Sequence, residues 1–166
     1  SMSKLKPAFN KDGVVTAATS SPLTDGAAAV LVCSADYANN NDLEILAYIR
    51  GMAVSGCAPE IMGIGPVLSS QKALERAGIN LEDVDIIEMN EAFAAQSLAC
   101  VEELGIDMSK LNIHGGAIAM GHPLGASGAR ITGKAASLLK ETGKRYALST
   151  MCVGGGQGCA TVLERA

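Results

Sequence analysis

Three polar side chains at the ends of expected strands or helices could carry acyl chemistry: Asn90, His122 and Cys152. A neutral imidazole can take a proton from a thiol or donate a hydrogen bond to a carbonyl oxygen. His122 lies between Gly121 and Pro123, and neither neighbour shields its ring with bulk. Residues 154–156 are glycines close behind Cys152, and their bare N–H groups could face a developing oxyanion. The residue types therefore predict cysteine and histidine acyl chemistry.

Each of these features also has a structural explanation when it is taken alone. Asn90 suits the N-cap of a helix, and a glycine run suits a tight connection between strands. His122 is equally suited to a structural role. The glycines do not form a phosphate-binding pattern, because Gly-Lys-Ser/Thr and Gly-x-Gly-x-x-Gly are both missing from the sequence.

A helical pattern follows His122 directly. Pro123 suits the first position of a helix. Apolar residues then recur at helical spacing up to Gly143, at Leu124, Ile131, Ala135, Leu138 and Leu139. We expect His122 at the positive end of this helix, where a neutral ring is favoured over imidazolium.

Strand and helix patterns alternate along the rest of the chain. We expect strands over 27–33, 44–57, 84–88, 145–151 and 159–163, and helices over 66–77 and 91–104. Residues 34–41 are polar and form a boundary. The alternation predicts a layered α/β fold with a mixed, mostly parallel sheet and helices on both faces. In such sheets ligands gather beyond the carboxyl ends of the strands, where Asn90 and Cys152 are expected.

Composition excludes several classes of protein. With a net charge of -4 and only 3% aromatic residues, the 166-residue chain lacks both a cationic surface and a stacking platform for nucleic acid. No apolar run reaches the roughly 18 residues of a membrane span. The five cysteines match no zinc or disulfide framework, so we expect no metal and reduced thiols in a cytoplasmic protein. All but Cys152 are expected to be buried.

The sequence resembles the thiolase family in four blocks that occur in the family's order. These are residues 90–96, which begin Asn-Glu-Ala-Phe, residues 112–130 around His122, the Cys-x-Gly block at 151–158, and residues 16–29 together with 62–66. The resemblance extends over about residues 5–165. It implies a thiolase-like half-domain that transfers acyl groups between thioesters.

The resemblance assigns sharper roles to four of these residues. His122 is similar to the histidine that activates the nucleophilic cysteine and helps to bind the thioester oxygen. Cys152 is similar to the second cysteine, which moves a proton to and from the α-carbon or the CoA thiol. Asn90 matches the asparagine that holds a water in the first oxyanion hole, and Gly154 matches the glycine whose N–H contributes to the second.

Substrate contacts are implied in the same way. Ser21 and Met62 fall where the family contacts coenzyme A, and Phe93 falls where it lines the acyl pocket. Coenzyme A and acyl-CoA are then the two co-substrates, and no cofactor is bound covalently. Residues 19–24 and 49–57 are more similar to degradative 3-ketoacyl-CoA thiolases, which act in fatty-acid β-oxidation, than to the biosynthetic acetoacetyl-CoA type.

The chain departs from the family in its length. A thiolase is about twice this size, and nothing here matches the motif of its acyl-accepting cysteine. Residues 1–41 are expected to be the end of the loop region and the last strand of the N-terminal half, and residues 42–166 the C-terminal domain. We expect inactivity alone, an N-terminal thiolase half as partner, and self-association through exposed apolar faces. The alternative is a non-catalytic half that acts as an interaction subunit.

Overall fold

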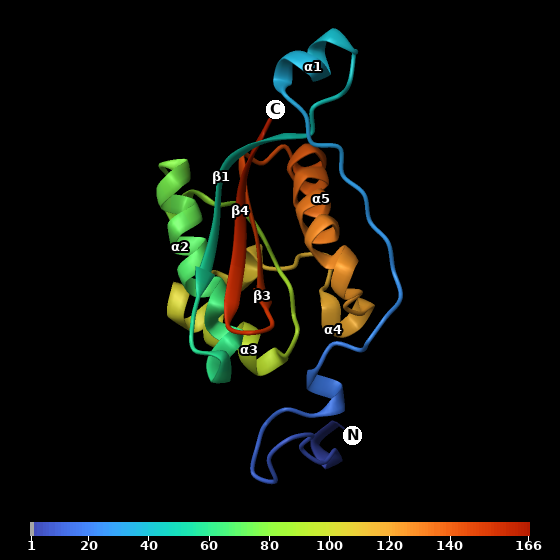
Figure 1. Cartoon of the computed structure of the whole chain (residues 1–166), viewed down its shortest axis with the longest axis vertical. Helices are drawn as coiled ribbons and strands as arrows, with labels where there is room; N and C mark the ends of the chain where they lie inside the picture. The colour runs from blue at the N-terminus through green and yellow to red at the C-terminus, as the bar shows by residue number, and fades with distance from the viewer. Residues whose placement is uncertain (1) are drawn as a thin grey trace.

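A four-stranded mixed sheet forms the centre of the protein (Figure 1). The computed structural model describes residues 2–166. The strands are β1 (Ala47–Gly56), β2 (Ile86–Met89), β3 (Tyr146–Val153) and β4 (Gln157–Arg165), in the order β1-β4-β3-β2. β2 pairs with β3 in parallel, whereas β4 is antiparallel to both β1 and β3. Thus β1, β2 and β3 share one direction and β4 alone opposes them. This confirms a mixed sheet, although two of its three pairings are antiparallel because β4 lies between β1 and β3.

Helices cover both faces of this sheet, as predicted (Figure 1). α2 (Gly65–Ala77) and α3 (Ala94–Leu104) lie on one face, and α5 (Leu124–Thr142) lies on the other. Each of the three ends where a glycine was expected to stop it, because Gly78, Gly105 and Gly143 adopt left-handed backbone angles that favour glycine. α4 (Ala117–Met120) is a single turn before His122, and 3-10 turns occupy Met2–Lys4, Ala17–Thr19, Pro59–Ile64, Leu81–Asp83 and Met108–Lys110.

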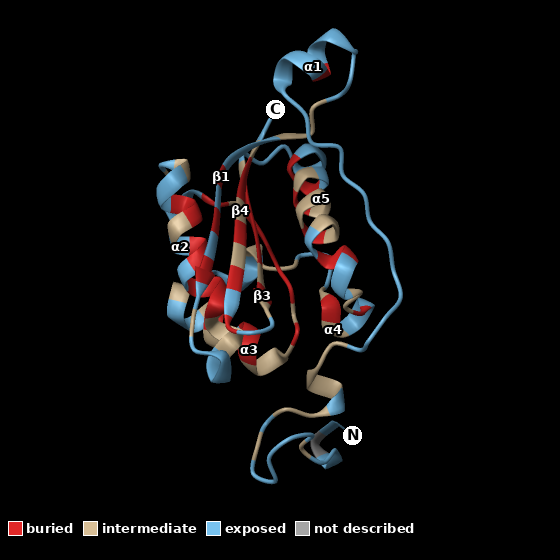
Figure 2. Cartoon of the chain, viewed as in Figure 1, coloured by how far each residue is buried: buried red, intermediate tan, exposed pale blue. Residues whose placement is uncertain are grey.

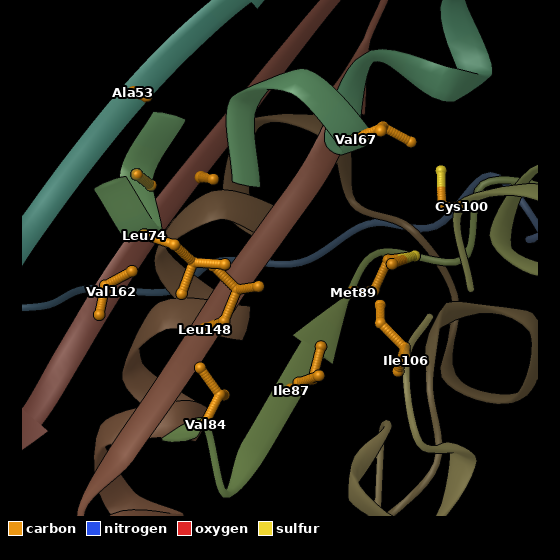
Figure 3. Packing of buried hydrophobic residues seen from close by; sticks show 12 residues of the cluster. Ala53, Val67, Leu74, Val84, Ile87, Met89, Cys100, Ile106, Leu148 and Val162 are labelled. Carbon is orange, nitrogen blue, oxygen red and sulfur yellow. The ribbon is translucent and has the colours of Figure 1, made fainter. Parts of the chain in front are cut away.

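Two apolar clusters hold the layers together. On the α2 side, Leu74, Ile87, Leu148 and Val162 are buried side by side (Figure 3). On the α5 side, the buried residues are Ile86, Ala135, Leu138, Leu139, Ala147 and Leu163. Full burial of one such aliphatic side chain contributes about 1.5–3 kcal/mol. Both clusters are anchored on β2 and β3, so the ends of these two strands are held firmly.

The start of α2 approaches β4 closely enough to require glycine. A Cβ on Gly158 would collide with the backbone of Gly65, and a Cβ on Gly65 would collide with the backbone of Gln157. The hairpin that follows Cys152 is therefore fixed against α2 by backbone contact, without an intervening side chain.

The prediction of a buried strand over 27–33 is wrong. These residues are extended but unpaired and exposed, and they run along the outside of α5 (Figure 2). A strand needs a neighbouring strand for its hydrogen bonds, and the described residues offer none there. Leu31 and Val32 are 74% and 68% exposed. Residues 34–41, the expected boundary, contain a short helix, α1 (Ala35–Asn40), which Ser34 caps.

Candidate active site

Residues 20–24 connect the two loops that carry the predicted site residues. The Ser21 amide donates to Ala92 O at 3.1 Å, just after Asn90 in the chain. The His122 amide donates to Pro22 O at 3.2 Å and to Thr24 Oγ1 at 3.0 Å. This segment therefore fixes the loop after β2 and the loop before α5 relative to each other.

The structure brings Asn90 and His122 together. Asn90 follows β2, and its amide donates to Thr150 O of β3 at 3.0 Å. Its Nδ2 lies 3.3 Å from His122 Nε2. Asn90 is 1% exposed and its Oδ1 has no hydrogen-bond partner among the described residues. It does not cap α3, whose N-cap is Phe93. Its position is thus explained by the contact with His122, and the helix-cap interpretation is wrong.

Asn112 and Glu91 clamp the end of β2 to the segment that leads to His122. Asn112 Oδ1 accepts from the Met89 amide at 2.9 Å, and its Nδ2 donates to Met89 O at 2.9 Å and to Glu91 Oε1 at 2.6 Å. Glu91 Oε2 accepts from the Ile118 amide at 3.1 Å. Sequence reasoning assigned no role to Asn112, although it begins the block around His122. Its φ of 45° is rare outside glycine and marks the turn where the clamp forms.

His122 lies two residues before the start of α5, and its ring contacts that helix. Pro123 is the N-cap of α5, so its expected place at the first helical position is off by one residue. Nδ1 of the ring lies 2.6 Å from Ser127 Oγ. Ser127 is fully buried and was missed by the sequence interpretation, which treated the helix only as an apolar pattern.

The surroundings of His122 favour its neutral form. Burial lowers the pKa of the ring below its ordinary value, and the positive charge of Arg130 lowers it further. The direction of this pKa shift agrees with the expected neutral ring. Its main cause, however, is desolvation and not the positive end of the helix. A neutral ring can accept a proton, so the geometry and the charge state suit a base.

The titration of His122 should therefore lie below pH 6.5, the ordinary midpoint. As the pH falls, the ring in the unfolded chain binds a proton before the ring in the folded chain does. The contribution of His122 to the free energy of unfolding is therefore complete above pH 6.5 and should fall as the pH drops towards the folded midpoint. NMR titration of the ring carbons gives the midpoint directly, and the chain has only two histidines to assign. A midpoint at or above 6.5 would contradict the environment described here.

Cys152 lies in β3 opposite Gly158 of β4 and is 5% exposed, so the expectation that it would be the one cysteine not buried is wrong. Burial raises the pKa of its thiol, and the nearby Cys57 contributes in the same direction. A backbone hydrogen bond lowers the pKa by less than burial raises it, and no described imidazole is hydrogen-bonded to the sulfur, so the thiol lacks the lowered pKa that a resting thiolate would need. Cys152 is thus held as a thiol, which is a proton donor.

The glycines after Cys152 form the turn between β3 and β4, as the structural explanation predicts. Gly155 and Gly156 both have a φ of 87°. Gly154 has an ordinary φ, and a Cβ there would meet nothing within 4 Å. The space beside the Gly154 backbone is open to a ligand.

The other cysteines differ from the expectation that all are buried. Cys100 is fully buried, Cys57 and Cys159 are half-buried, and Cys33 is exposed because segment 27–33 is unpaired. Burial raises the pKa of Cys100 to about 11.

Alkylation should follow this order of exposure. At pH 8, iodoacetamide should label Cys33 first and Cys100 and Cys152 last, because the two buried thiols have little thiolate. Peptide mass mapping over a time course measures the rates. Labelling of Cys152 as fast as that of Cys33 would contradict its burial.

Ser21, Met62 and Phe93 are distributed around these loops. Ser21 Oγ donates to Ala92 O at 3.3 Å, which places Ser21 beside Phe93. The Phe93 ring meets Phe9 edge to face at 6.2 Å between centroids. Met62 lies in the 3-10 turn that packs on α3, and its side chain is half-buried. No described contact joins Met62 to Ser21.

A small hollow opens beside His122. It has a volume of about 400 Å³ and is lined by Leu23, Thr24, Asp25, His122 and Leu124. A larger hollow of about 820 Å³ lies between segment 28–35 and α5, and it contains none of the predicted site residues. The larger hollow is therefore separate from the predicted site residues, of which His122 lines the smaller one.

Two features are absent from residues 2–166. No helix there has both the length and the apolar character to cross a membrane. No three His, Cys, Asp or Glu side chains there gather as metal ligands do.

Comparison with known proteins identifies the family of this chain. The family model described as "Thiolase, C-terminal domain" matches residues 43–165, and "Thiolase, N-terminal domain" matches residues 1–36. The chain belongs to the thiolase family.

Individual relatives agree with this assignment. The chain is 55% identical to a 3-ketoacyl-CoA thiolase of Vibrio vulnificus (strain YJ016), over 99% of this chain and 43% of that protein. Among solved structures, the acetyl-CoA acetyltransferase of Bacillus anthracis (45% identity, TM-score 0.96) and human mitochondrial 3-ketoacyl-CoA thiolase in complex with CoA (44%, TM-score 0.92) each match 99% of this chain and 42% of their own. The chain thus spans less than half the length of these proteins.

Proposed function

We propose that this chain supplies part of the active site of a thiolase that cleaves 3-ketoacyl-CoA with CoA into acetyl-CoA and a shortened acyl-CoA, or runs the reverse condensation. The observation that carries the proposal is the pairing of Asn90 with a neutral, half-buried His122. The fold alone would not carry it, because one fold can host several chemistries. The polar pair beside a hollow is what supports acyl transfer.

Each residue has a task in this reaction. His122 takes the proton of an acyl-accepting cysteine on a partner N-terminal half, and the resulting thiolate attacks the 3-keto carbon. Asn90 Oδ1, which is buried and unpaired, holds a water that donates to the substrate oxygen. When the bond between the α- and β-carbons breaks, Cys152 protonates the α-carbon, so acetyl-CoA leaves and the shortened acyl group stays on the partner half's cysteine. The raised pKa of Cys152 supports this role because it keeps the proton on sulfur until that step. The Cys152 thiolate then takes the proton of the CoA thiol, which attacks the acyl group, and the proton on His122 returns to the released cysteine. The Gly154 N–H stabilises an oxyanion.

Coenzyme A and the acyl chain are assigned to the loops around these groups. Ser21 and Met62 contact CoA and Phe93 lines the acyl pocket. The CoA complex of the human relative supports CoA as the co-substrate. Residues 19–24 and 49–57, together with the Vibrio relative, favour the degradative substrate class in a reducing, cytoplasmic setting.

A partner completes the site. Residues 1–41 belong to an N-terminal half and its loop region, and residues 42–166 form the C-terminal domain. The unpaired, exposed residues 27–33 support this division, because a sheet in a partner half would satisfy their backbone. Alone, the 166-residue chain lacks the nucleophile and associates with itself through its exposed apolar side chains.

A chimera tests the proposal. The part of the Vibrio vulnificus relative that precedes the matched region is fused to this chain, and cleavage of acetoacetyl-CoA and of a longer 3-ketoacyl-CoA is measured. We expect turnover by the chimera, a preference for the longer substrate, and no turnover by the 166-residue chain. A folded chimera without turnover would overturn the proposal and favour the non-catalytic interaction subunit.

A further inference from the structure

Ser127 makes a contact that the predicted roles do not use. Its side chain is fully buried in the first turn of α5. Ser127 Oγ lies 2.6 Å from His122 Nδ1 and 3.1 Å from Pro123 O. Serines in helices often donate to the carbonyl four residues back, and Ser137 in α5 does so to Gly133 O at 3.0 Å. Only Ser127 combines this bond with a contact to an imidazole among the described residues.

The hydrogens of this group can be counted. Pro123 O can only accept, and we assign the single hydroxyl hydrogen of Ser127 to its 3.1 Å bond with this oxygen. Ser127 Oγ can then accept from His122 only if Nδ1 carries a hydrogen. A neutral ring with hydrogen on Nδ1 has a free lone pair on Nε2, which accepts from Asn90 Nδ2. In this arrangement the Ser127 hydroxyl hydrogen, the Nδ1 hydrogen and one of the two Asn90 Nδ2 hydrogens each have an acceptor.

The opposite tautomer fits the site less well. A hydrogen on Nε2 would require the Asn90 amide to turn its oxygen towards the ring. The NH2 group would then occupy the place of Oδ1, which has no partner among the described residues. The flipped amide would leave two buried N–H donors without acceptors, whereas the first arrangement leaves one N–H donor and one oxygen, and a buried unpaired N–H is rarer in folded proteins than an unpaired carbonyl oxygen.

We propose that Ser127 is a positioning residue that holds His122 in the tautomer with hydrogen on Nδ1 and leaves Nε2 free on the Asn90 side. The inference rests on the proposed function for its purpose, because a base needs its free nitrogen on the side of the substrate. When Nε2 binds the proton of the attacking thiol, a thiolate remains and Nδ1 keeps its hydrogen. Ser127 Oγ then accepts from an imidazolium, which strengthens the bond without moving the ring.

Nitrogen NMR of the 166-residue chain tests the tautomer without any turnover. Long-range 15N–1H spectra at pH 8 distinguish a protonated ring nitrogen from an unprotonated one, and the exposed His114 provides an internal reference. We expect Nδ1 of His122 protonated and Nε2 unprotonated. After Ser127→Ala, Nδ1 loses its acceptor, and both tautomers should be populated. Ser137→Ala, which removes only the helical back-bond, should leave the His122 signals unchanged.

The chimera adds a second measurement. Ser127→Ala should lower kcat about tenfold, as expected for the loss of one hydrogen bond in the transition state, whereas Ser137→Ala should not. An Nε2–H tautomer in the unmodified chain would overturn the inference, and so would a tautomer that Ser127→Ala leaves unchanged. Because the NMR result does not need turnover, it stands even if the chimera is inactive, so failure of this inference and failure of the proposed function are distinguishable.

Discussion

Replacing His122 with alanine in the chimera should lower CoA-dependent cleavage by a factor of about 10²–10⁴, the range for losing one general acid or base. The ring is the described group that combines a lowered pKa with a contact to Asn90. His114→Ala is the matched control, because its ring is exposed and contacts neither Asn90 nor Ser127 through a hydrogen bond. That variant should stay within about twofold of the unmodified chimera.

Steady-state rates at saturating CoA separate the possible results. If kcat falls and KM changes little, His122 acts in the chemical step. Equal losses for the two histidine variants would indicate damage to the fold, and retained turnover in His122→Ala would remove His122 from the mechanism. A circular dichroism spectrum of each variant shows whether the fold is intact.

Most of the fold could be predicted because local patterns and long-range packing agree. The helices end at glycines that adopt left-handed angles, and the strands β2 and β3 are buried runs that need no partner outside the chain. Segment 27–33 has an equally apolar pattern, but hydrophobicity cannot supply the neighbouring strand that turns an extended segment into part of a sheet.

Part of the candidate site could also be predicted from the sequence, namely the approach of Asn90 to His122. Asn90 and His122 converge because the first follows β2, the edge strand of the sheet, and the second precedes a helix that packs on the same sheet. The roles of Ser127 and Asn112 could not be predicted from the sequence. Both are small polar residues whose role depends on one contact in the folded chain, Ser127 with His122 and Asn112 with Glu91. The state of Cys152 was also inaccessible, because burial sets its pKa and depends on the packing of the strand.

Removing the charge of Lys134 should destabilise the 166-residue chain by about 3 kcal/mol at pH 7, the lower end for breaking a buried ion pair, because the Lys134 side chain is 21% exposed and the charge of Arg130 still acts on Glu88. Lys134 Nζ lies 3.0 Å from Glu88 Oε1 and donates to Gly115 O at 3.0 Å, so it joins β2 to the segment before His122. Glu88 is 2% exposed. In Lys134→Met its carboxylate would remain buried without its partner. The control is Lys140→Met in the same helix, whose exposed pair with Glu44 should contribute at most about 1 kcal/mol.

The pH dependence of this loss gives a sharper test. Burial raises the pKa of Glu88 while Lys134 lowers it, so Lys134→Met should raise the pKa further. A raised carboxyl pKa destabilises the folded state above that pKa, and the penalty disappears as the pH falls through it towards the unfolded value. Urea unfolding should therefore show a smaller difference between Lys134→Met and the unmodified chain at pH 5 than at pH 7. Adding Glu88→Gln should recover part of the loss at pH 7, since no charge is then left unpaired. Equal stability of Lys134→Met and Lys140→Met at both pH values would contradict this prediction. The Lys134–Glu88 pair would then contribute no more than an exposed surface pair, and β2 would be held by its apolar clusters alone.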